Sequence, residues 1–326
     1  MIEELRSKIS PEVRENEPLA QHTTYRIGGP AKYFFVAKSG DEAASAVRAA
    51  GESGVEYYIL GGGSNVLISD EGYPGLIIKM ANRGITIEGT KVKVEAGTPS
   101  AFVALQTAEA GLKGFEWAIA LPGTLGGAVR GNASMWDGGT AEVVETVRAV
   151  KNGETKDFTR EECAFGYRES VFKKEGGWVI LSVVLSLEQA EDADALRDSL
   201  KEMLRKKKDN QPIEYPTAGS IFRNWKPGAS EDLEELRKDL DLNKEEEIPI
   251  SLNGTIPAGW IIDRAQLKGL KVGKVSISEK HANFFINDGD AIANDVIALI
   301  GSVKSKVRDM THSVVQLTEE IEYVGF

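Results

Sequence analysis

The sequence predicts an α+β protein built from two or three packed subdomains. The chain has 326 residues, which is too long for one ordinary hydrophobic core. Hydrophobic residues recur at helical spacing in some segments and alternate as in strands in others. A polar stretch with prolines, residues 209–219, separates a long N-terminal part from a C-terminal part.

In the N-terminal part we expect helices at 41–53, 99–111 and 192–208. Asp41 would cap the first helix, and the second would begin at Pro99. The second helix carries Phe102, Leu105 and Ala108 on one face, and the third carries a stripe of Leu196, Leu200, Met203 and Leu204. Strands are expected at 57–60, 66–68, 76–78, 91–96, 143–150 and 178–187.

The C-terminal part mixes helix and strand signals. Residues 226–256 are acidic and low in large apolar groups, which predicts a surface excursion. A helix at 290–308 would bury one face formed by Ile292, Val296, Ile300, Val303 and Val307. A short strand is expected at 320–324.

Composition excludes several classes of protein. The formal net charge of -11 argues against a nucleic-acid binder. One basic cluster, Lys206–Lys208, departs from this acidic balance, and we interpret it as the solvated end of a helix. The alternative is that one of these lysines faces an anionic ligand. Cys163 is the single cysteine and the three histidines lack paired spacing, so we expect neither a disulfide framework nor a metal centre. No apolar run approaches membrane length and no signal peptide precedes residue 18, which predicts a cytoplasmic protein that does not bind membranes.

Gly61-Gly62-Gly63-Ser64-Asn65 forms the first of two glycine-rich loops. Each glycine costs about 1 kcal/mol of backbone entropy relative to alanine, so three in a row suggest a purpose. Without Cβ atoms the backbone can approach a ligand closely and direct N–H groups at an anion. A tight hairpin without a ligand is the alternative, and the three glycines alone do not decide between them.

The second loop contains Pro122, Gly123, Thr124, Gly126 and Gly127, followed by Gly131-Asn132. It matches neither the GxGxxG nor the P-loop pattern. Two such loops roughly 60 residues apart fit a dinucleotide whose diphosphate lies on backbone amides, which need no basic patch. A third segment, Thr23–Ala31, joins Tyr25 and Arg26 to a glycine pair, with a purely structural turn as the alternative.

Seven motifs then occur in one order: TYRIGGPA, LGGGSNVLI, LPGTLGGAV with GNA, FGYRESVF, AGSIFRN, AGWIID through VSISEKHANFFIN, and EEIEYVG. In this order the chain resembles the UDP-N-acetylenolpyruvoylglucosamine reductases of bacterial peptidoglycan precursor synthesis, over residues 18–326. The resemblance implies an FAD-binding domain of the vanillyl-alcohol-oxidase (PCMH) type. Its two subdomains would be 1–80 and 81–209, followed by an α+β substrate-binding domain at 210–319, with the strand near 320–326 returning to the site.

The resemblance also implies a monomer with non-covalent FAD and NADPH as reductant. Hydride would pass from NADPH to FAD and then to the vinyl carbon of UDP-N-acetylglucosamine enolpyruvate, giving UDP-N-acetylmuramate. Arg168 matches the arginine that binds the carboxylate, Ser220 the proton donor and Glu320 the catalytic acid. Strand alternation places Glu322 on the same face as Glu320, so Glu322 stays open as the acid.

The other implied site residues fall into two groups. Those for the cofactor are Tyr25, Arg26, Gly61, Gly62, Gly63, Ser64, Asn65, Pro122, Gly123, Thr124, Gly126, Gly127 and Asn132. Those for the substrate are Tyr167, Arg223, Asn224, Tyr215 and His281, with Lys208 a weaker candidate for phosphate and a buried structural role the alternative for His281.

Two departures from the family pattern affect the pocket. Residues 173–218 leave no room for the long tyrosine-bearing loop of some members, whereas 225–257 keep an insertion typical of others, so the arrangement that covers the substrate stays open. Asn132-Ala133-Ser134-Met135-Trp136 replaces a common NAGAYG. Two other functions also stay open, an FAD-dependent alcohol or sugar oxidase and a flavin module without catalysis.

Overall fold

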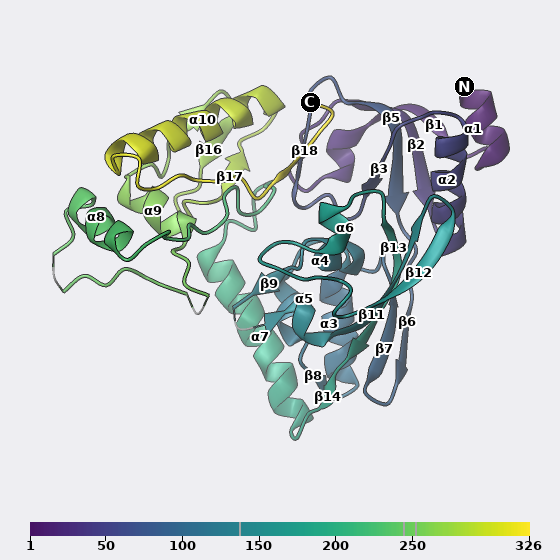
Figure 1. Cartoon of the computed structure of the whole chain (residues 1–326), viewed down its shortest axis with the longest axis horizontal. Helices are drawn as coiled ribbons and strands as arrows, with labels where there is room; N and C mark the ends of the chain where they lie inside the picture. The colour runs from purple at the N-terminus through teal and green to yellow at the C-terminus, as the bar shows by residue number, and fades with distance from the viewer. Residues whose placement is uncertain (137, 244, 252) are drawn as a thin grey trace. The chain divides into compact units, whose positions relative to one another are not determined.

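The structure is a computed structural model that describes residues 1–136, 138–243, 245–251 and 253–326 (Figure 1). The chain forms two compact units that interleave in sequence. The first unit comprises Met1–Glu17, Pro30–Gly63 and Tyr73–Asp209, and the second comprises Pro18–Gly29, Ser64–Gly72 and Asn210–Phe326. Within the described residues, no helix has the length and hydrophobicity needed to cross a bilayer.

The first unit contains two main sheets. One has the order β1-β2-β5-β3, in which β2 and β3 both run parallel to β5. The other is antiparallel with the order β12-β11-β13-β7-β6. The strands are β1 (Arg14–Pro18), β2 (Pro30–Ala37), β3 (Tyr57–Leu60), β5 (Tyr73–Met80), β6 (Ile85–Glu88), β7 (Lys91–Glu95), β11 (Val144–Lys151), β12 (Glu154–Thr159) and β13 (Val179–Ser186).

Helices and shorter elements surround these sheets. The longest helices are α2 (Gly40–Glu52), α3 (Ser100–Glu109) and α7 (Ala193–Asn210), and α2 packs against β2 and β5 (Figure 1). The shorter elements are α1 (Ile2–Lys8), β8 (Leu112–Lys113), η2 (Glu116–Ala120), α4 (Leu125–Arg130), β9 (Ser134–Met135), β10 (Gly138–Gly139), α5 (Thr140–Val143), α6 (Val171–Lys174) and β14 (Glu188–Gln189). Ser39, not Asp41, caps α2, because its hydroxyl accepts a hydrogen bond from the Glu42 amide.

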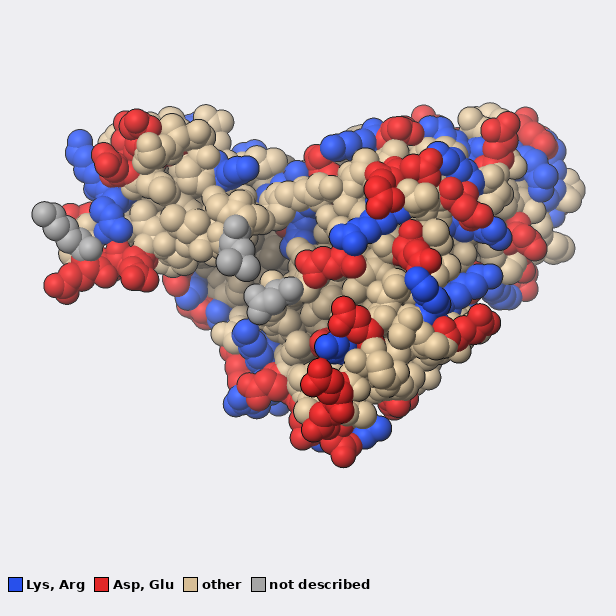
Figure 2. All heavy atoms as spheres, turned by 60° about the horizontal axis from the view of Figure 1, so that its bottom comes forward, with Lys and Arg blue, Asp and Glu red and all other residues tan. Residues whose placement is uncertain are grey.

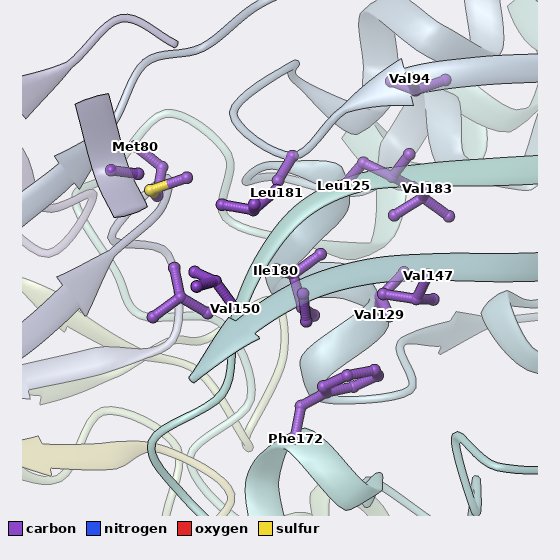
Figure 3. Packing of buried hydrophobic residues seen from close by; sticks show 14 of the residues in the cluster. Met80, Val94, Leu125, Val129, Val147, Val150, Phe172, Ile180, Leu181 and Val183 are labelled. Carbon is purple, nitrogen blue, oxygen red and sulfur yellow. The ribbon is translucent and has the colours of Figure 1, made fainter. Parts of the chain in front are cut away.

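One hydrophobic core joins the two sheets of the first unit. It includes Ile78 of β5 together with Val147 of β11 and Val183 of β13, all fully buried. Figure 3 shows Leu125 and Val129 of α4 among these sheet side chains. Fully burying a side chain of this size contributes roughly 1.5–3 kcal/mol. The core therefore fixes α4, and with it the second glycine loop, on the sheet.

The predicted face of α3 is confirmed at Ala108 and wrong at Phe102 and Leu105. Phe102 and Leu105 are 44% and 41% exposed, whereas Val103, Ala104 and Ala108 are buried. The two alanines let α3 pack closely on η2, which large side chains on that face would prevent. Residues with small side chains therefore face inward here, although they contribute least to a hydrophobicity pattern.

The predicted hydrophobic stripe of α7 is confirmed only in part. In α7, Leu196 and Leu200 are buried but Leu204 is 47% exposed, because the packed cluster around Ala108 extends only to Leu200.

The interpretation of Lys206–Lys208 as a wholly solvated helix end is wrong for Lys207. Its ammonium donates to the Ala120 carbonyl, and burial lowers the pKa of the side chain.

The second unit is built around α10. This helix packs on β15 and β16 of a three-stranded antiparallel sheet with the order β15-β16-β17 (Figure 1). Apart from Ile292, which is exposed and precedes the helix, its predicted inward face is buried as expected. The elements are η1 (Leu19–His22), β4 (Val66–Ile68), α8 (Glu231–Asp239), α9 (Ala258–Arg264), β15 (Lys271–Val272), β16 (Val275–Ile277), β17 (Phe285–Asn287), α10 (Ala293–Met310) and β18 (Glu322–Val324).

The acidic segment 226–256 leaves and re-enters the second unit at one point. Trp225 and Ile256 form an antiparallel bridge, with N–H···O distances of 2.9 and 2.7 Å. The segment carries α8, whose Leu236 is fully buried in the core of the unit. The predicted surface excursion is therefore anchored to the core through Leu236, with Leu233, Leu240 and Ile248 packed against the same cluster. On the face drawn in Figure 2, Asp and Glu side chains are interspersed with Lys and Arg.

Candidate active site

The first glycine loop, residues 61–65, connects strands of two different sheets. It follows β3, which pairs with β5, and precedes β4, which pairs with β18. The alternative of a tight hairpin is therefore wrong. The loop also crosses from the first unit to the second, because Gly63 belongs to one and Ser64 to the other.

Glycines of the first loop pack directly on the second loop. A Cβ atom on Gly62 would lie 2.5 Å from the Cα of Gly123, and one on Gly61 would lie 2.7 Å from Oγ1 of Thr124. Real Cβ atoms essentially never approach other atoms within 3.0 Å. The bare backbone is thus needed for the contact between the loops, a reason for the glycines that the sequence did not reveal.

Hydrogen bonds fix the second loop to the sheet beneath it. The Leu125 and Gly126 amides donate to the carbonyls of Thr98 and Ala96, each at 2.9 Å. Thr124 caps the short helix α4 by accepting from the Gly127 amide at 3.4 Å. Some of the amides expected to bind phosphate are therefore engaged by the protein itself, which makes this loop a rigid wall.

A cavity of about 180 Å³ lies in the first unit where the two loops meet. Its lining includes Gly61 from the first loop and Thr124, Gly126 and Gly127 from the second. The lining also includes aromatic side chains and an arginine, namely Tyr57, Tyr58, Phe172, Trp178 and Arg130. Glycine backbone, flat apolar walls and a cation suit a ligand that carries both phosphate and a planar ring.

Lys79 fastens the first glycine loop and was not singled out in the sequence. It lies in β5, and its ammonium donates to the Gly61 carbonyl at 2.6 Å. Burial, together with the charge of Arg83, lowers the pKa of Lys79 to about 8. A lysine inside the apolar run LIIKM is the sequence signal that could have identified this residue.

A tight turn in the first unit presents Arg168. Gly166 and Glu169 exchange backbone hydrogen bonds of 3.0 and 3.1 Å, which leaves Tyr167 and Arg168 at the tip. Arg168 has a φ of +57°, a left-handed backbone conformation that residues other than glycine rarely adopt. Its guanidinium lies 5.7 Å from the centroid of the Tyr167 ring. The turn thus projects an arginine and an aromatic ring together.

Asn132, expected at the cofactor, makes two contacts inside the first unit. Its Nδ2 donates to the Gly166 carbonyl at 2.8 Å, and its Oδ1 accepts from the Ala141 amide at 3.1 Å. The Ser170 hydroxyl adds a bond of 2.6 Å to the Arg130 carbonyl. These bonds tie the turn that carries Arg168 to the end of α4. A contact between Asn132 and the cofactor stays a prediction.

In the second unit, Ser220 and Glu320 lie on adjacent backbone segments. The Glu320 amide donates to the Ile221 carbonyl at 2.8 Å. Asn65 of the first glycine loop donates through Nδ2 to the Glu320 carbonyl at 3.2 Å. A Cβ on Gly219, whose φ is +79°, would lie 3.9 Å from the Ser64 carbonyl oxygen. The end of the glycine loop is therefore close to both predicted catalytic residues.

The neighbouring glutamates have different surroundings. Glu319 forms an ion pair of 3.0 Å with Lys304 of α10. The terminal strand begins at Glu322, not at Glu320 as expected, because Glu320 instead bonds to the segment after Ser220. Glu320 therefore bonds through its backbone next to Ser220, whereas Glu322 bonds to Asn65. Which of the two is the acid stays a prediction.

The predicted substrate residues of the second unit are held to different degrees. Arg223 donates from its backbone to the Thr318 carbonyl at 2.9 Å, and Asn224 accepts from the Ala258 amide at 3.3 Å. Tyr215 is 47% exposed. His281 accepts from the Asn283 amide through Nδ1 and packs edge-on against a phenylalanine, and burial lowers its pKa. These contacts support the His281 ring within the second unit. A contact between His281 and the substrate stays a prediction.

Tyr25 and Arg26 have contrasting environments. Tyr25 is fully buried in the core of the second unit, and its hydroxyl has no hydrogen-bond partner among the described residues. Burial raises the pKa of this hydroxyl. Arg26 is exposed with a φ of +56°. A single sequence motif therefore supplies one core residue and one surface cation.

Comparison with known proteins identifies the family. Residues 31–158 match the model of an FAD binding domain, and 211–324 match that of the UDP-N-acetylenolpyruvoylglucosamine reductase C-terminal domain. The chain is 36% identical to the UDP-N-acetylenolpyruvoylglucosamine reductase of Carboxydothermus hydrogenoformans over 99% of this chain and 97% of that one. It belongs to the UDP-N-acetylenolpyruvoylglucosamine reductase family. The reductase of Lachnoclostridium phytofermentans is 35% identical over 100% of this chain and 97% of its own length.

A solved reductase agrees in fold. The crystal structure from Thermus caldophilus aligns with a TM-score of 0.74 and 30% identity, covering 96% of this chain and 98% of that one. The predicted α+β fold with an FAD-binding domain is confirmed, and this member of the reductase family is an FAD-dependent oxidoreductase. The cavity of about 180 Å³ is smaller than the roughly 300–1,000 Å³ of pockets that hold whole ligands of drug size.

The departures from the reductase pattern have structural counterparts. Residues 173–218, all of which the structure describes, are occupied mainly by β13, β14 and α7. The insertion at 225–257 carries α8 and closes on itself through the bridge from Trp225 to Ile256. Ser134, which replaces a glycine of the common NAGAYG, contacts Arg168.

Proposed function

We propose that this chain reduces the enolpyruvyl ether of UDP-N-acetylglucosamine to the lactyl ether of UDP-N-acetylmuramate, for peptidoglycan precursor synthesis. NADPH is the reductant, and the protein acts as a cytoplasmic monomer. The observation that carries the proposal is the double role of the first glycine loop. Gly61 lines the cavity, and Gly61 and Gly62 pack on the second loop. At the other end of the loop, Asn65 donates to the Glu320 carbonyl, and the Glu320 amide bonds to Ile221 next to Ser220.

FAD would be held by the glycine loops and their neighbours. Gly61, Thr124, Gly126 and Gly127 already line one cavity, and the fixed loops keep their backbone close to a bound diphosphate. When bound, FAD supplies the chemistry of accepting a hydride from NADPH and delivering it to the vinyl carbon of the substrate. The remaining predicted contacts for the cofactor are Tyr25, Arg26, Gly62, Gly63, Ser64, Asn65, Pro122, Gly123 and Asn132.

Arg168 binds the substrate carboxylate in this proposal. Hydride addition at the vinyl carbon drives negative charge onto the neighbouring carbon and the carboxylate. A guanidinium pairs with a carboxylate through two parallel hydrogen bonds, and the pairing strengthens as charge accumulates. Tyr167 at the same tip contacts the enolpyruvyl group.

Ser220 and Glu320 complete the reaction. Ser220 donates its hydroxyl proton to the carbon next to the carboxylate, which is basic enough in that state to accept from an alcohol. Glu320 is the catalytic acid that stabilises the charge on the substrate carboxylate. Arg223, Asn224, Tyr215 and His281 hold the remainder of the substrate. The proposal includes the predicted division of the chain into two FAD-binding subdomains and a substrate-binding domain. The boundaries lie at 80/81, 209/210 and 319/320.

The test separates the two half-reactions of the holoenzyme. Ser220→Ala should leave reduction of the flavin by NADPH unchanged and slow its reoxidation by the enolpyruvyl substrate by about 100-fold or more, as expected for loss of a general acid. Ser302→Ala, in which the exposed serine of α10 that bonds to Ala298 is changed, is the matched control. A Ser220→Ala enzyme with both half-reactions at wild-type rates would remove Ser220 from the mechanism.

NADPH oxidation without substrate tests the function as a whole. The reductase should consume NADPH only slowly until the enolpyruvyl compound is added, whereas a flavin oxidase would instead turn over an alcohol or sugar with oxygen. Equal NADPH consumption with and without the substrate would contradict the reductase. NADH in place of NADPH, measured in the same assay, tests the choice of reductant.

A further inference from the structure

The guanidinium of Arg168 is held by Ser134. The Nη1 nitrogen of Arg168 donates to the Ser134 hydroxyl at 2.8 Å and to the Ser134 carbonyl at 3.3 Å. Both residues belong to the first unit. A hydrogen bond from a charged donor is among the stronger polar contacts in proteins, and two acceptors on one nitrogen restrict the guanidinium plane as well as its position.

Ser134 itself sits on a supported backbone. It opens β9, which pairs antiparallel with β10, so Ser134 lies opposite Gly139. The preceding carbonyl, that of Ala133, accepts from both the amide and the hydroxyl of Thr140, at 2.9 and 2.7 Å. The backbone that carries Ser134 is therefore supported by the pairing of β9 with β10 and by the two hydrogen bonds from Thr140.

The backbone on the arginine side is strained and needs such support. Arg168 has a φ of +57°, and residues in this region persist where surrounding contacts determine them. Asn132, two residues before Ser134, donates to the Gly166 carbonyl on the same turn. One segment, 132–134, thus holds the turn at its base and the side chain at its tip.

We propose that Ser134 is a positioning residue that orients the Arg168 guanidinium toward the substrate carboxylate. The inference rests on the proposed function, in which Arg168 binds that carboxylate. An arginine has many rotamers, and holding one of them before the substrate arrives removes an entropy loss that binding would otherwise carry. The expected signature is a selective effect on ligands that bear the carboxylate.

The experiment measures ligand binding to the oxidised holoenzyme through the change in flavin absorbance. Two ligands are compared, the enolpyruvyl substrate and UDP-N-acetylglucosamine, which lacks the carboxylate. Ser134→Ala should weaken binding of the substrate by about tenfold, the lower end for a hydrogen bond to a charged group. Binding of UDP-N-acetylglucosamine should change by less than about twofold, and Ser134→Thr, which keeps the hydroxyl, should restore the substrate affinity.

Ser199→Ala is the matched control, because the Ser199 hydroxyl of α7 bonds only within its own helix, to the Leu196 carbonyl at 2.7 Å. Ser134 is exposed, so its truncation to alanine leaves no buried cavity, and the melting temperature of the holoenzyme verifies this. Equal weakening of both ligands, or no change for either, would overturn the role proposed for Ser134.

A double-mutant cycle separates this inference from the function on which it rests. If Ser134 acts through Arg168, adding Ser134→Ala to Arg168→Met should cause no further loss of substrate affinity. If Arg168→Met alone leaves the substrate affinity intact, the assignment of Arg168 to the carboxylate fails. If Arg168→Met weakens binding strongly while Ser134→Ala does not, only the positioning role of Ser134 fails.

Discussion

Gly62→Ala tests whether the contact between the two glycine loops builds the FAD site. The new Cβ would lie 2.5 Å from the Cα of Gly123 and 3.2 Å from its carbonyl carbon. Carbon atoms in contact sit about 3.5–4.0 Å apart, so the loops must separate by roughly 1 Å. Both partners are backbone, and therefore no side-chain rotation can relieve the overlap.

The displacement sets the size of the expected effect. A hydrogen bond near 3.0 Å that lengthens by roughly 1 Å is lost, and bonds to a charged group contribute about 1.5–3 kcal/mol each. Loss of two amide bonds to the diphosphate would weaken FAD binding by about 3–6 kcal/mol, which is at least 100-fold in the dissociation constant. Overpacking should also lower the free energy of unfolding of the apoprotein by about 1–3 kcal/mol.

The assay titrates apoprotein with FAD and follows quenching of flavin fluorescence, with thermal unfolding measured on the same samples. Gly51→Ala is the control, because a Cβ there meets nothing within 4 Å and the residue lies in helix α2. The control should bind FAD normally and gain up to about 1 kcal/mol of stability. A Gly62→Ala protein that binds FAD with wild-type affinity would refute the reasoning, even if its melting temperature falls.

Three further predictions concern stability and reactivity. The pKa of Lys79, lowered by burial to about 8, lies below the value of about 10.4 for an unfolded lysine, so the unfolded state holds more protons between these pH values. The wild type should therefore gain up to about 3 kcal/mol in unfolding free energy from pH 8 to 10.5, and urea titrations of Lys79→Met should lack this gain. Burial raises the pKa of Cys163 to about 12, so iodoacetamide at pH 8 should alkylate it only after unfolding, as judged by mass spectrometry; rapid labelling of the native protein would contradict this. Asp70 accepts from the amide of Ala293, the first residue of α10, at 2.7 Å. Asp70→Ala should lower the unfolding free energy by about 0.5–2 kcal/mol in thermal melts, whereas an unchanged melting temperature would show that this bond does not stabilise the helix end.

Local signals predicted most of the regular elements. The strands at 57–60 and 66–68 have the bounds expected from their apolar runs, because short apolar runs bounded by polar or glycine residues are typical of strands. The inward face of α3 was mispredicted at Phe102 and Leu105, because the small Ala104 packs inward beside the correctly predicted Ala108. The pairing of β4 with β18 was also out of reach of local patterns, because it joins residues far apart in sequence.

Site residues that lie in a sequence motif could be predicted. Contacts that form only in the folded protein could not. Ser220 and Glu320 were proposed from motif order, and the structure brings their backbone segments together. The bond from Asn65 to Glu320 and the hold of Ser134 on Arg168 depend on the fold. No spacing rule connects residues that meet only after loops and sheets are assembled.

The interleaved chain path has a consequence for how the protein is made. A ribosome releases residues 64–72 long before residues 322–324, yet β4 finds its partner only in β18. The first unit, whose segments end at Asp209, can therefore mature while β4 still has an unpaired edge, a state prone to wrong association. A nascent chain stalled before Glu320 would possess both glycine loops but not the backbone carbonyl to which Asn65 donates. Translation order thus delays this contact until residue 320 has been made.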